Sequence, residues 1–262
     1  MSFLNVIFAG LVLLVFGACT GQKDASPESL VVFAASSLTN AFADMATSFE
    51  QANPGAEVEL VFAASSTLRL QLEQGAKADI FTSANERQLQ LAQEAGLFEG
   101  APLAFASTDL TIAARAGGPV TFFEDLASAG VRLALAGEEV PAGAYAAQFL
   151  DQLARDPAFG PGWVGQVMRN VVSREPNVRQ VLAKVQLGAV DAAIVYSTDL
   201  AAVQGGQVTE VAVPPEHSIS ASFWIGLIKD GGQSGQAAAF VHFVHSEEGQ
   251  ALLAQHGFEG SP

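Results

Sequence analysis

One six-residue sequence occurs twice in this chain, in neighbouring segments. Val-Phe-Ala-Ala-Ser-Ser spans residues 32–37 and again residues 61–66. Each copy ends an apolar run rich in β-branched residues and begins a segment in which apolar residues recur at helical spacing. Each copy therefore predicts a strand that leads into a helix at a pair of serines. Because the N–H groups of a first helical turn have no partner within the helix, two such ends brought together form a site for a small anion.

Strand-like and helix-like segments alternate along the rest of the chain, which is typical of α/β proteins with mostly parallel sheets. Strands are predicted at residues 30–33, 58–62, 78–82, 110–114, 131–136, 192–196, 207–213 and 223–229. Helices are predicted between them, and two of these carry a clear apolar stripe. The stripes are Leu38, Phe42, Met45 and Phe49, and Val178, Val181, Leu182 and Val185.

These α/β units are too many for a single compact lobe, so we expect two lobes. The expected fold class is a two-lobed α/β protein in which each lobe is a mostly parallel sheet flanked by helices. Residues 30–107 and 215–262 are expected to form lobe 1, and residues 108–214 lobe 2. Proteins of this architecture bind their ligands in the cleft between the lobes, at the carboxyl ends of strands.

The charge balance excludes one class of partner. The chain has 12 Lys and Arg residues against 27 Asp and Glu residues, a formal net charge of −15. It has no basic run that would neutralise phosphates, so no nucleic acid partner is expected, and an anionic membrane surface is disfavoured. The acidity itself favours solubility more than it indicates a cationic ligand.

The N-terminal segment resembles a bacterial lipoprotein signal. Residues 3–18 are nearly all apolar and lead directly to Cys19, the only cysteine of the chain. The run is short for a spanning helix and is typical of a secretory signal. We therefore expect residues 1–18 to be a signal peptide, Cys19 to be lipidated, and residues 19–29 to be a flexible tether. The alternatives are an uncleaved anchor and a start site placed elsewhere.

Six segments between Leu30 and Phe258, two of which contain the repeated motif, carry a resemblance to a known family. They are FAASSLTNAF from Phe33, FAASSTL from Phe62, GAKADIFTSA from Gly75, VPAGAYA from Val140, NVR from Asn177 and GAVDAAIVYSTD from Gly188. Together they resemble the periplasmic molybdate-binding proteins of ABC importers, which belong to the type II solute-binding proteins. This resemblance covers essentially the whole chain after the tether.

The resemblance implies a binding protein that captures molybdate or tungstate and delivers it to a membrane permease. It implies no enzymatic activity, no cofactor, no metal other than that of the oxyanion, a monomeric state, and a place in the periplasm or on the outer face of the cytoplasmic membrane. It also implies the groups that hold the ligand. These are the hydroxyls of Ser37 and Ser65, the backbone amides of Ala142 and Val178, and the phenol of Tyr196.

Several residues near the predicted site also have possible structural roles that need no ligand. A serine at the start of a helix is often only a cap, and Ser36, Ser66 and Thr67 are rivals to the two chosen serines. Three arginines near the predicted site are expected to pair with local carboxylates such as Glu73 and Glu175 rather than with the anion; they are Arg69, Arg174 and Arg179. Three aspartates are expected to act as caps rather than catalysts; they are Asp79, Asp191 and Asp199.

The chain also contains residue types that are used in hydrolases and in metal sites. The four histidines are His217, His242, His245 and His256, and together with serines they raise the possibility of a hydrolase. No serine lies in a Gly-x-Ser-x-Gly sequence, which disfavours that reading. His242 and His245 have the spacing of a metal pair but no accompanying acidic or cysteine ligand. Sulfate, thiosulfate, phosphate or a ferric complex are alternative ligands, although the two tyrosines are few for a ferric site.

Overall fold

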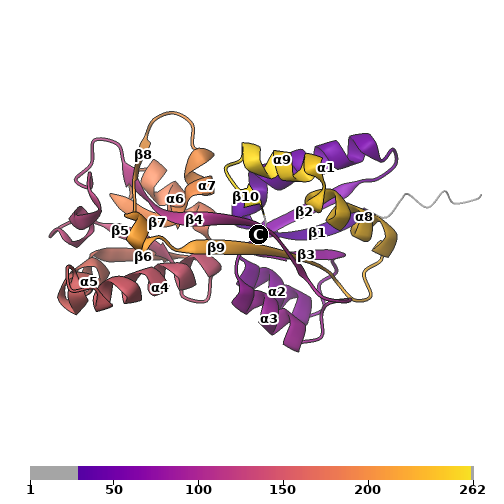
Figure 1. The fold of residues 1–262 in the computed structure, drawn as a ribbon, viewed down its shortest axis with the longest axis horizontal. Coiled ribbons are helices and arrows are strands. Elements are labelled where there is room, and N and C mark those ends of the chain that lie inside the picture. The colour runs from indigo at the N-terminus through magenta and orange to yellow at the C-terminus, as the bar shows by residue number, and fades with distance from the viewer. Residues whose placement is uncertain (1–28, 261–262) are drawn as a thin grey trace, which may run out of the picture.

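The computed structural model describes residues 29–260. The predicted signal peptide, Cys19 and most of the tether lie outside the described residues. Within residues 29–260, none of the helices combines the length and apolar character needed to cross a membrane. Figure 1 shows two lobes side by side, each made of strands with helices on both faces.

The first lobe is built on three parallel strands, β1 (Leu30–Ala35), β2 (Val58–Ala63) and β3 (Ile80–Ser83). Helices α2 (Ser65–Glu73) and α3 (Glu86–Glu94) cover one face of this sheet. Helices α1 (Thr39–Ala52), α8 (Ser234–His245) and α9 (Glu247–Gln255) cover the other. The predicted apolar stripe of α1 is confirmed, because its four residues are all buried against the sheet.

The second lobe repeats this plan with β5 (Leu133–Ala136), β6 (Val171–Glu175) and β7 (Ala192–Tyr196), which run parallel. Its helices are α4 (Pro141–Arg155), α5 (Gly160–Asn170), α6 (Val178–Gln186) and α7 (Ser197–Ala201). The predicted stripe of α6 is also buried. Short 3-10 turns lie at Ser36–Leu38 (η1), Phe123–Ala127 (η2) and Pro215–His217 (η3).

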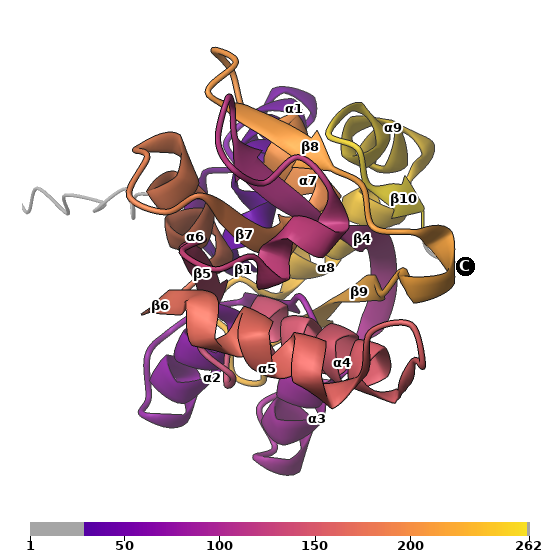
Figure 2. The same ribbon diagram turned by 90° about the vertical axis from the view of Figure 1, so that its left-hand side faces the viewer.

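One strand belongs to both lobes. Strand β4 (Leu103–Arg115) pairs through Asp109 with β9 (Ser220–Leu227), and from Leu110 onward with β7 and β8 (Val208–Val211). The resulting strand order is β2-β1-β3-β9-β4-β7-β5-β6, with β8 and β10 (Glu259–Gly260) also paired to β4. Figure 2 shows the helices of both lobes around this continuous path of strands. The expected fold class, two α/β lobes with mostly parallel strands, is confirmed.

Two strands differ from the sequence-based expectation. The apolar pattern predicts a strand only over residues 110–114, but β4 begins at Leu103 because β9 pairs with residues 103–109. The pattern predicts no strand at residues 171–175, yet β6 forms there. Strand β6 pairs only with β5, at the end of the sheet, so alternate side chains face solvent and the segment lacks an apolar run.

Candidate functional site

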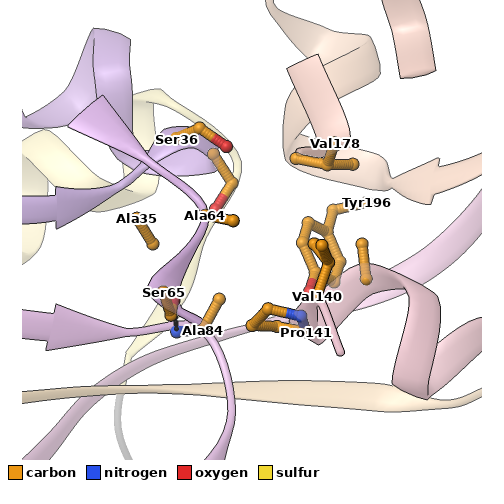
Figure 3. A pocket seen from close by; sticks show the side chains of 11 residues that line it. Ala35, Ser36, Ala64, Ser65, Ala84, Val140, Pro141, Val178 and Tyr196 are labelled. Atoms are coloured by element: carbon orange, nitrogen blue, oxygen red, sulfur yellow. Dashed lines mark hydrogen bonds between the residues drawn. The ribbon is translucent and has the colours of Figure 1, made fainter. Parts of the chain in front are cut away.

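All five residues predicted to hold the ligand line one small cavity between the lobes. About 200 Å³ of space not filled by atoms, part of it open to solvent, lies within its lining. Figure 3 shows Ser36 and Ser65 on one side, with Val140, Pro141, Val178 and Tyr196 facing them. The full lining is Ala35, Ser36, Ser37, Ala64, Ser65, Ala84, Val140, Pro141, Ala142, Val178 and Tyr196.

The first lobe contributes the two repeated strand-to-helix junctions. Ser65 is the first residue of α2 and is almost completely buried. Its Oγ accepts a hydrogen bond from the Ala84 N–H at 3.0 Å, so the hydroxyl proton remains available to a group in the cavity. Ser37 lies in the η1 turn that leads into α1, and its side chain is also buried. Both serines are therefore placed as donors toward the same space.

The neighbouring hydroxyls differ in position. Ser36 lines the cavity together with Ser37, so the first junction presents two serines. Ser66 and Thr67 belong to α2 but are not part of the lining. The second junction therefore presents only Ser65 to the cavity.

The second lobe contributes two helix N-termini. Pro141 occupies the first position of α4, where the missing N–H of proline costs nothing, and Ala142 follows it. Val178 is the first residue of α6, and the preceding Asn177 accepts the Gln180 N–H on its side chain at 3.0 Å. That cap leaves the earlier N–H groups of α6 without an intrahelical partner. The cavity thus lies among helix N-termini from both lobes, where helix dipoles favour negative charge.

Tyr196 ends β7 and closes the cavity from the second lobe. The residue is only 1% exposed, and its hydroxyl is buried with no hydrogen-bond partner among the described residues. Burial, together with nearby Tyr145 and Asp199, raises the pKa of the Tyr196 phenol well above its usual value. The phenol therefore stays protonated at neutral pH and has a proton to donate. A buried polar atom left unpaired is costly, and this phenol is a free donor in the lining of the cavity.

The cavity lining carries no charged side chain. Its residues are alanines, serines, valines, a proline and a tyrosine. An anion held here would be stabilised by neutral donors and helix ends alone. Such donors have to be numerous, because an anion removed from water without hydrogen bonds is strongly destabilised.

The arginines near the site pair with carboxylates, as expected, although two partners differ. Arg69 pairs with Glu73. Arg174 lies 3.5 Å from Glu138, and Arg179 lies 2.9 Å from Asp199, so neither pairs with Glu175. Glu175 instead accepts from Lys184 and Ser173. Adjacency in sequence did not identify these partners because the two arginines reach across to other elements.

Two of the three aspartates, Asp79 and Asp191, accept hydrogen bonds from segments distant in sequence. Asp79 accepts backbone N–H groups of Val31 and Gln233, each at 2.8 Å. Asp191 lies between Arg115 and Arg132, and the hydrogen bonds from Arg132 contribute most to lowering its pKa. None of the three is the N-cap residue of a described helix, so the expectation that they act as caps was wrong in detail.

Asp199 differs from the other two because it is fully buried. Burial raises its pKa to about 6, against the opposing effect of Arg179. The Arg179 Nε lies 2.9 Å from the Asp199 Oδ1, but its N–H is not aimed at that oxygen. The two groups therefore attract as charges rather than through a directed hydrogen bond.

The histidines do not gather around the cavity. His245 contacts the Val241 and Ala104 carbonyls, and His256 contacts Asp44 at 2.8 Å. Across residues 29–260, no group of three or more His, Cys, Asp or Glu side chains is placed to hold a metal ion.

Comparison with known proteins identifies the family. The family model for bacterial extracellular solute-binding proteins matches residues 30–259. The chain belongs to this family.

Relatives of this solute-binding protein share most of its length. The molybdate-binding protein ModA of Mycobacterium tuberculosis is 35% identical, over 97% of this chain and 94% of its own. ModA of Escherichia coli is 31% identical, over 96% of each chain. A putative ABC transporter substrate-binding lipoprotein of Bacillus subtilis, YvgL, is 27% identical over 94% of this chain and 93% of its own.

Solved structures have the same fold. The substrate-binding domain of a putative molybdenum ABC transporter from Clostridium difficile is 26% identical, with a TM-score of 0.66 over 89% of this chain and 99% of its own. The sulfate-binding protein SubI of Mycobacterium tuberculosis is 20% identical, with a TM-score of 0.78 over 88% of this chain and 86% of its own. At that identity, SubI supports the fold alone.

The lining of the candidate site also contains residues that the sequence motifs did not single out. Ala84 ends the junction after β3 and lines the cavity beside Ser65. Because parallel strands end at one edge of a sheet, this third junction lies beside the two serine junctions. Ala35, Ala64, Val140 and Pro141 present backbone and small apolar surface, for which the sequence carries no separate signal.

A glycine in the VPAGAYA segment lets the first turn of α4 pack closely on the loop that precedes it. A Cβ at Gly143 would lie 1.9 Å from the Gly137 carbonyl oxygen, so Gly143→Ala should displace the N-terminus of α4. We expect a loss of about 1–3 kcal/mol in the free energy of unfolding and weaker ligand binding. The matched control is Gly162→Ala in α5, where a Cβ would meet nothing within 4 Å. Equal unfolding midpoints for both variants would contradict this account.

The buried carboxyl predicts a pH effect on stability. The pKa of Asp199 is raised in the folded state, so the folded protein binds this proton more tightly than the unfolded chain. Lowering the pH from about 7.5 to about 5 should therefore stabilise the parent relative to Asp199→Asn, by about 1–1.5 kcal/mol. The measurement is denaturant unfolding of both proteins, without ligand, at the two pH values.

Asp191→Asn is the control for that experiment. The pKa of Asp191 is lowered, so its stabilising effect is lost only when the pH falls below the ordinary aspartate range. The stability difference between the parent and Asp191→Asn should stay constant over the same window. An unchanged difference for Asp199→Asn as well would show that its carboxyl is not destabilised by burial.

Proposed function

We propose that this protein captures molybdate or tungstate outside the cytoplasm and delivers it to an ABC importer in the membrane. The observation that carries the proposal is a small, uncharged cavity between two lobes, lined by helix N-termini, buried serines and the unpaired phenol of Tyr196. Family membership and the relatives named as molybdate-binding proteins support it. The protein binds and releases its ligand and catalyses no reaction.

The proposed ligand contacts follow from the arrangement of donors. The hydroxyls of Ser37 and Ser65 approach from the first lobe, and the amides of Ala142 and Val178 and the phenol of Tyr196 from the second. A tetrahedral dianion offers acceptors in every direction and can use donors on both sides at once. No cofactor is needed, and the only metal is that of the oxyanion.

Uncharged donors also give selectivity. The amides have no acceptor to offer, so a protonated oxyanion such as hydrogen phosphate would bury an O–H group poorly paired. Sulfate is fully ionised and is not excluded in this way. Size must then separate the two, because donors spaced to reach the oxygens of molybdate would make longer and weaker hydrogen bonds to the smaller sulfate.

We infer that lobe closure completes the site. The lobes are proposed to comprise residues 30–107 with 215–262, and residues 108–214. His217 lies 3.5 Å from Asp156 and packs against Phe159 of the second lobe, which favours a second crossover slightly beyond residue 215. A ligand stabilises the closed arrangement only through contacts from both lobes at once.

Export and anchoring complete the proposal. We infer that residues 1–18 direct secretion and that Cys19 carries the lipid, with residues 19–29 as tether, which places the protein at the outer face of the cytoplasmic membrane. The lipoprotein description of the Bacillus subtilis relative is consistent with this. The protein would act as a monomer and present both lobes to the permease.

Sulfate binding is the second candidate. The structural similarity to SubI, with a TM-score of 0.78, shows that the same fold serves a sulfate-binding protein. The ligand test must therefore include sulfate.

Thermal unfolding with each oxyanion tests the function. A ligand at about 100 times its dissociation constant stabilises a protein by about 2.7 kcal/mol, which raises the unfolding midpoint by about 5–11 °C for a protein of this size. We expect molybdate and tungstate to raise the midpoint and sulfate and phosphate to leave it unchanged. A rise with sulfate alone would transfer the specificity to the second candidate, and no rise with any of the four would refute oxyanion binding.

Two serines on one helix test the site assignment. Ser65→Ala should weaken molybdate binding about 10- to 100-fold, because a hydrogen bond to a charged group is lost. Ser66→Ala is the matched control, since Ser66 is equally buried but does not line the cavity. Tyr196→Phe should resemble Ser65→Ala. Isothermal titration measures all three, and equal affinities for the two serine variants would show that the assignment is wrong.

A further inference from the structure

Two hydrogen bonds between side chains and backbone connect the lobes, each close in sequence to residues that line the cavity. The Arg179 Nη2 donates to the Ser37 carbonyl at 3.2 Å, and the Gln88 Nε2 donates to the Glu139 carbonyl at 3.0 Å. Arg179 and Glu139 belong to the second lobe, whereas Ser37 and Gln88 belong to the first. Neither donor lines the cavity itself.

The first of these cross-lobe hydrogen bonds, or links, is the one from Arg179, whose guanidinium lies against a buried carboxylate. Arg179 follows Val178 at the start of α6, and its Nε lies 2.9 Å from the fully buried Asp199. Asp199 in turn lies one turn after Tyr196. The guanidinium therefore connects the Ser37 segment to two segments of the opposite lobe that line the cavity. It also neutralises a carboxylate that would otherwise repel an anion nearby.

The second link, from Gln88 to the Glu139 carbonyl, is also oriented by a charged side chain. Gln88 is buried, and its Oε1 accepts from the Arg69 Nε at 2.8 Å. Because the guanidinium can only donate, this contact fixes the oxygen toward Arg69 and the amide N–H toward Glu139. Arg69 lies on α2, the helix that begins with Ser65, and Glu139 precedes Val140 at the start of α4. This link too connects cavity-lining segments of opposite lobes.

The two links have a common design. Each uses a buried or half-buried donor, oriented by a charged partner within its own lobe, and a carbonyl next to a cavity-lining segment of the other lobe. Both hydrogen bonds exist only when the lobes are together, and neither uses a ligand atom. They therefore favour the closed arrangement whether or not the cavity is filled.

We propose that Arg179 and Gln88 are positioning residues that hold the cleft closed around the bound oxyanion and so set the rate at which it is released. This inference rests on the proposed function for the identity of the ligand. The hydrogen bonds themselves do not depend on it.

The kinetic test uses Arg179→Gln, Gln88→Met and the double variant. Each single change should raise the molybdate dissociation rate about tenfold, as expected for loss of one hydrogen bond, and should change the association rate much less. The controls are Arg174→Gln, which removes the same charge from an exposed position of the same lobe, and Gln90→Met on the exposed face of α3. Both controls should release molybdate at the parent rate.

A second readout separates positioning from general destabilisation. Spin labels at the exposed positions Gln93 and Leu187, in a Cys19→Ser background, report the distance between lobes with and without molybdate. We expect a smaller closed fraction in the Arg179 and Gln88 variants in both conditions. Unfolding midpoints of the ligand-free variants show whether the fold itself is altered.

The outcomes are distinct. Parent-like release rates and closed fractions in both variants would overturn the proposal, as would equal losses in the two controls. If the parent binds neither molybdate nor tungstate, the proposed function fails. The label distances of the ligand-free proteins then still decide whether the two hydrogen bonds favour closure.

Discussion

Parallel strands of one sheet end at the same edge, and the helices that follow them begin there. In this protein each lobe places such an edge against the other, so helix N-termini from both sides meet at one cavity. Each N-terminus carries unpaired N–H groups and the positive end of a helix dipole. The chemistry of the site thus depends on topology first. The serines, the tyrosine and the small alanines add specificity to a position that the chain direction already makes favourable to an anion.

Charged side chains are absent from the wall of the cavity and occur only behind it, among the described residues. The wall of the cavity is uncharged, while the nearest ion pair, Arg179 with Asp199, lies behind it. A cation in the wall would attract any anion, whereas neutral donors at fixed positions distinguish anions by shape and protonation. The overall net charge of −15 has little influence here, because exposed charges are screened by salt and the local dipoles are not.

Local patterns predicted much of this structure, and long-range pairing accounts for the rest. The repeated serine motif and the apolar stripes of α1 and α6 depend on neighbours a few residues away, so the sequence displays them directly. All five predicted ligand residues lie on such junctions and line one cavity. By contrast, β6 and the first half of β4 owe their conformation to partners far along the chain. The same is true of the ion pair between Arg179 and Asp199, which no local spacing indicates.

The passage of β4 through both lobes has a mechanical consequence. No loop separates the pairing with β9, which ends at Asp109, from the pairing with β7, which begins at Leu110. A relative rotation of the lobes must therefore be absorbed by a few backbone dihedral angles in a hydrogen-bonded strand, and by the short return crossing before β9. Such a joint resists sliding and twisting and leaves bending as the soft coordinate. Occupancy of the cavity would then be expressed as one angle between two rigid bodies, a signal that a membrane partner can read without touching the ligand.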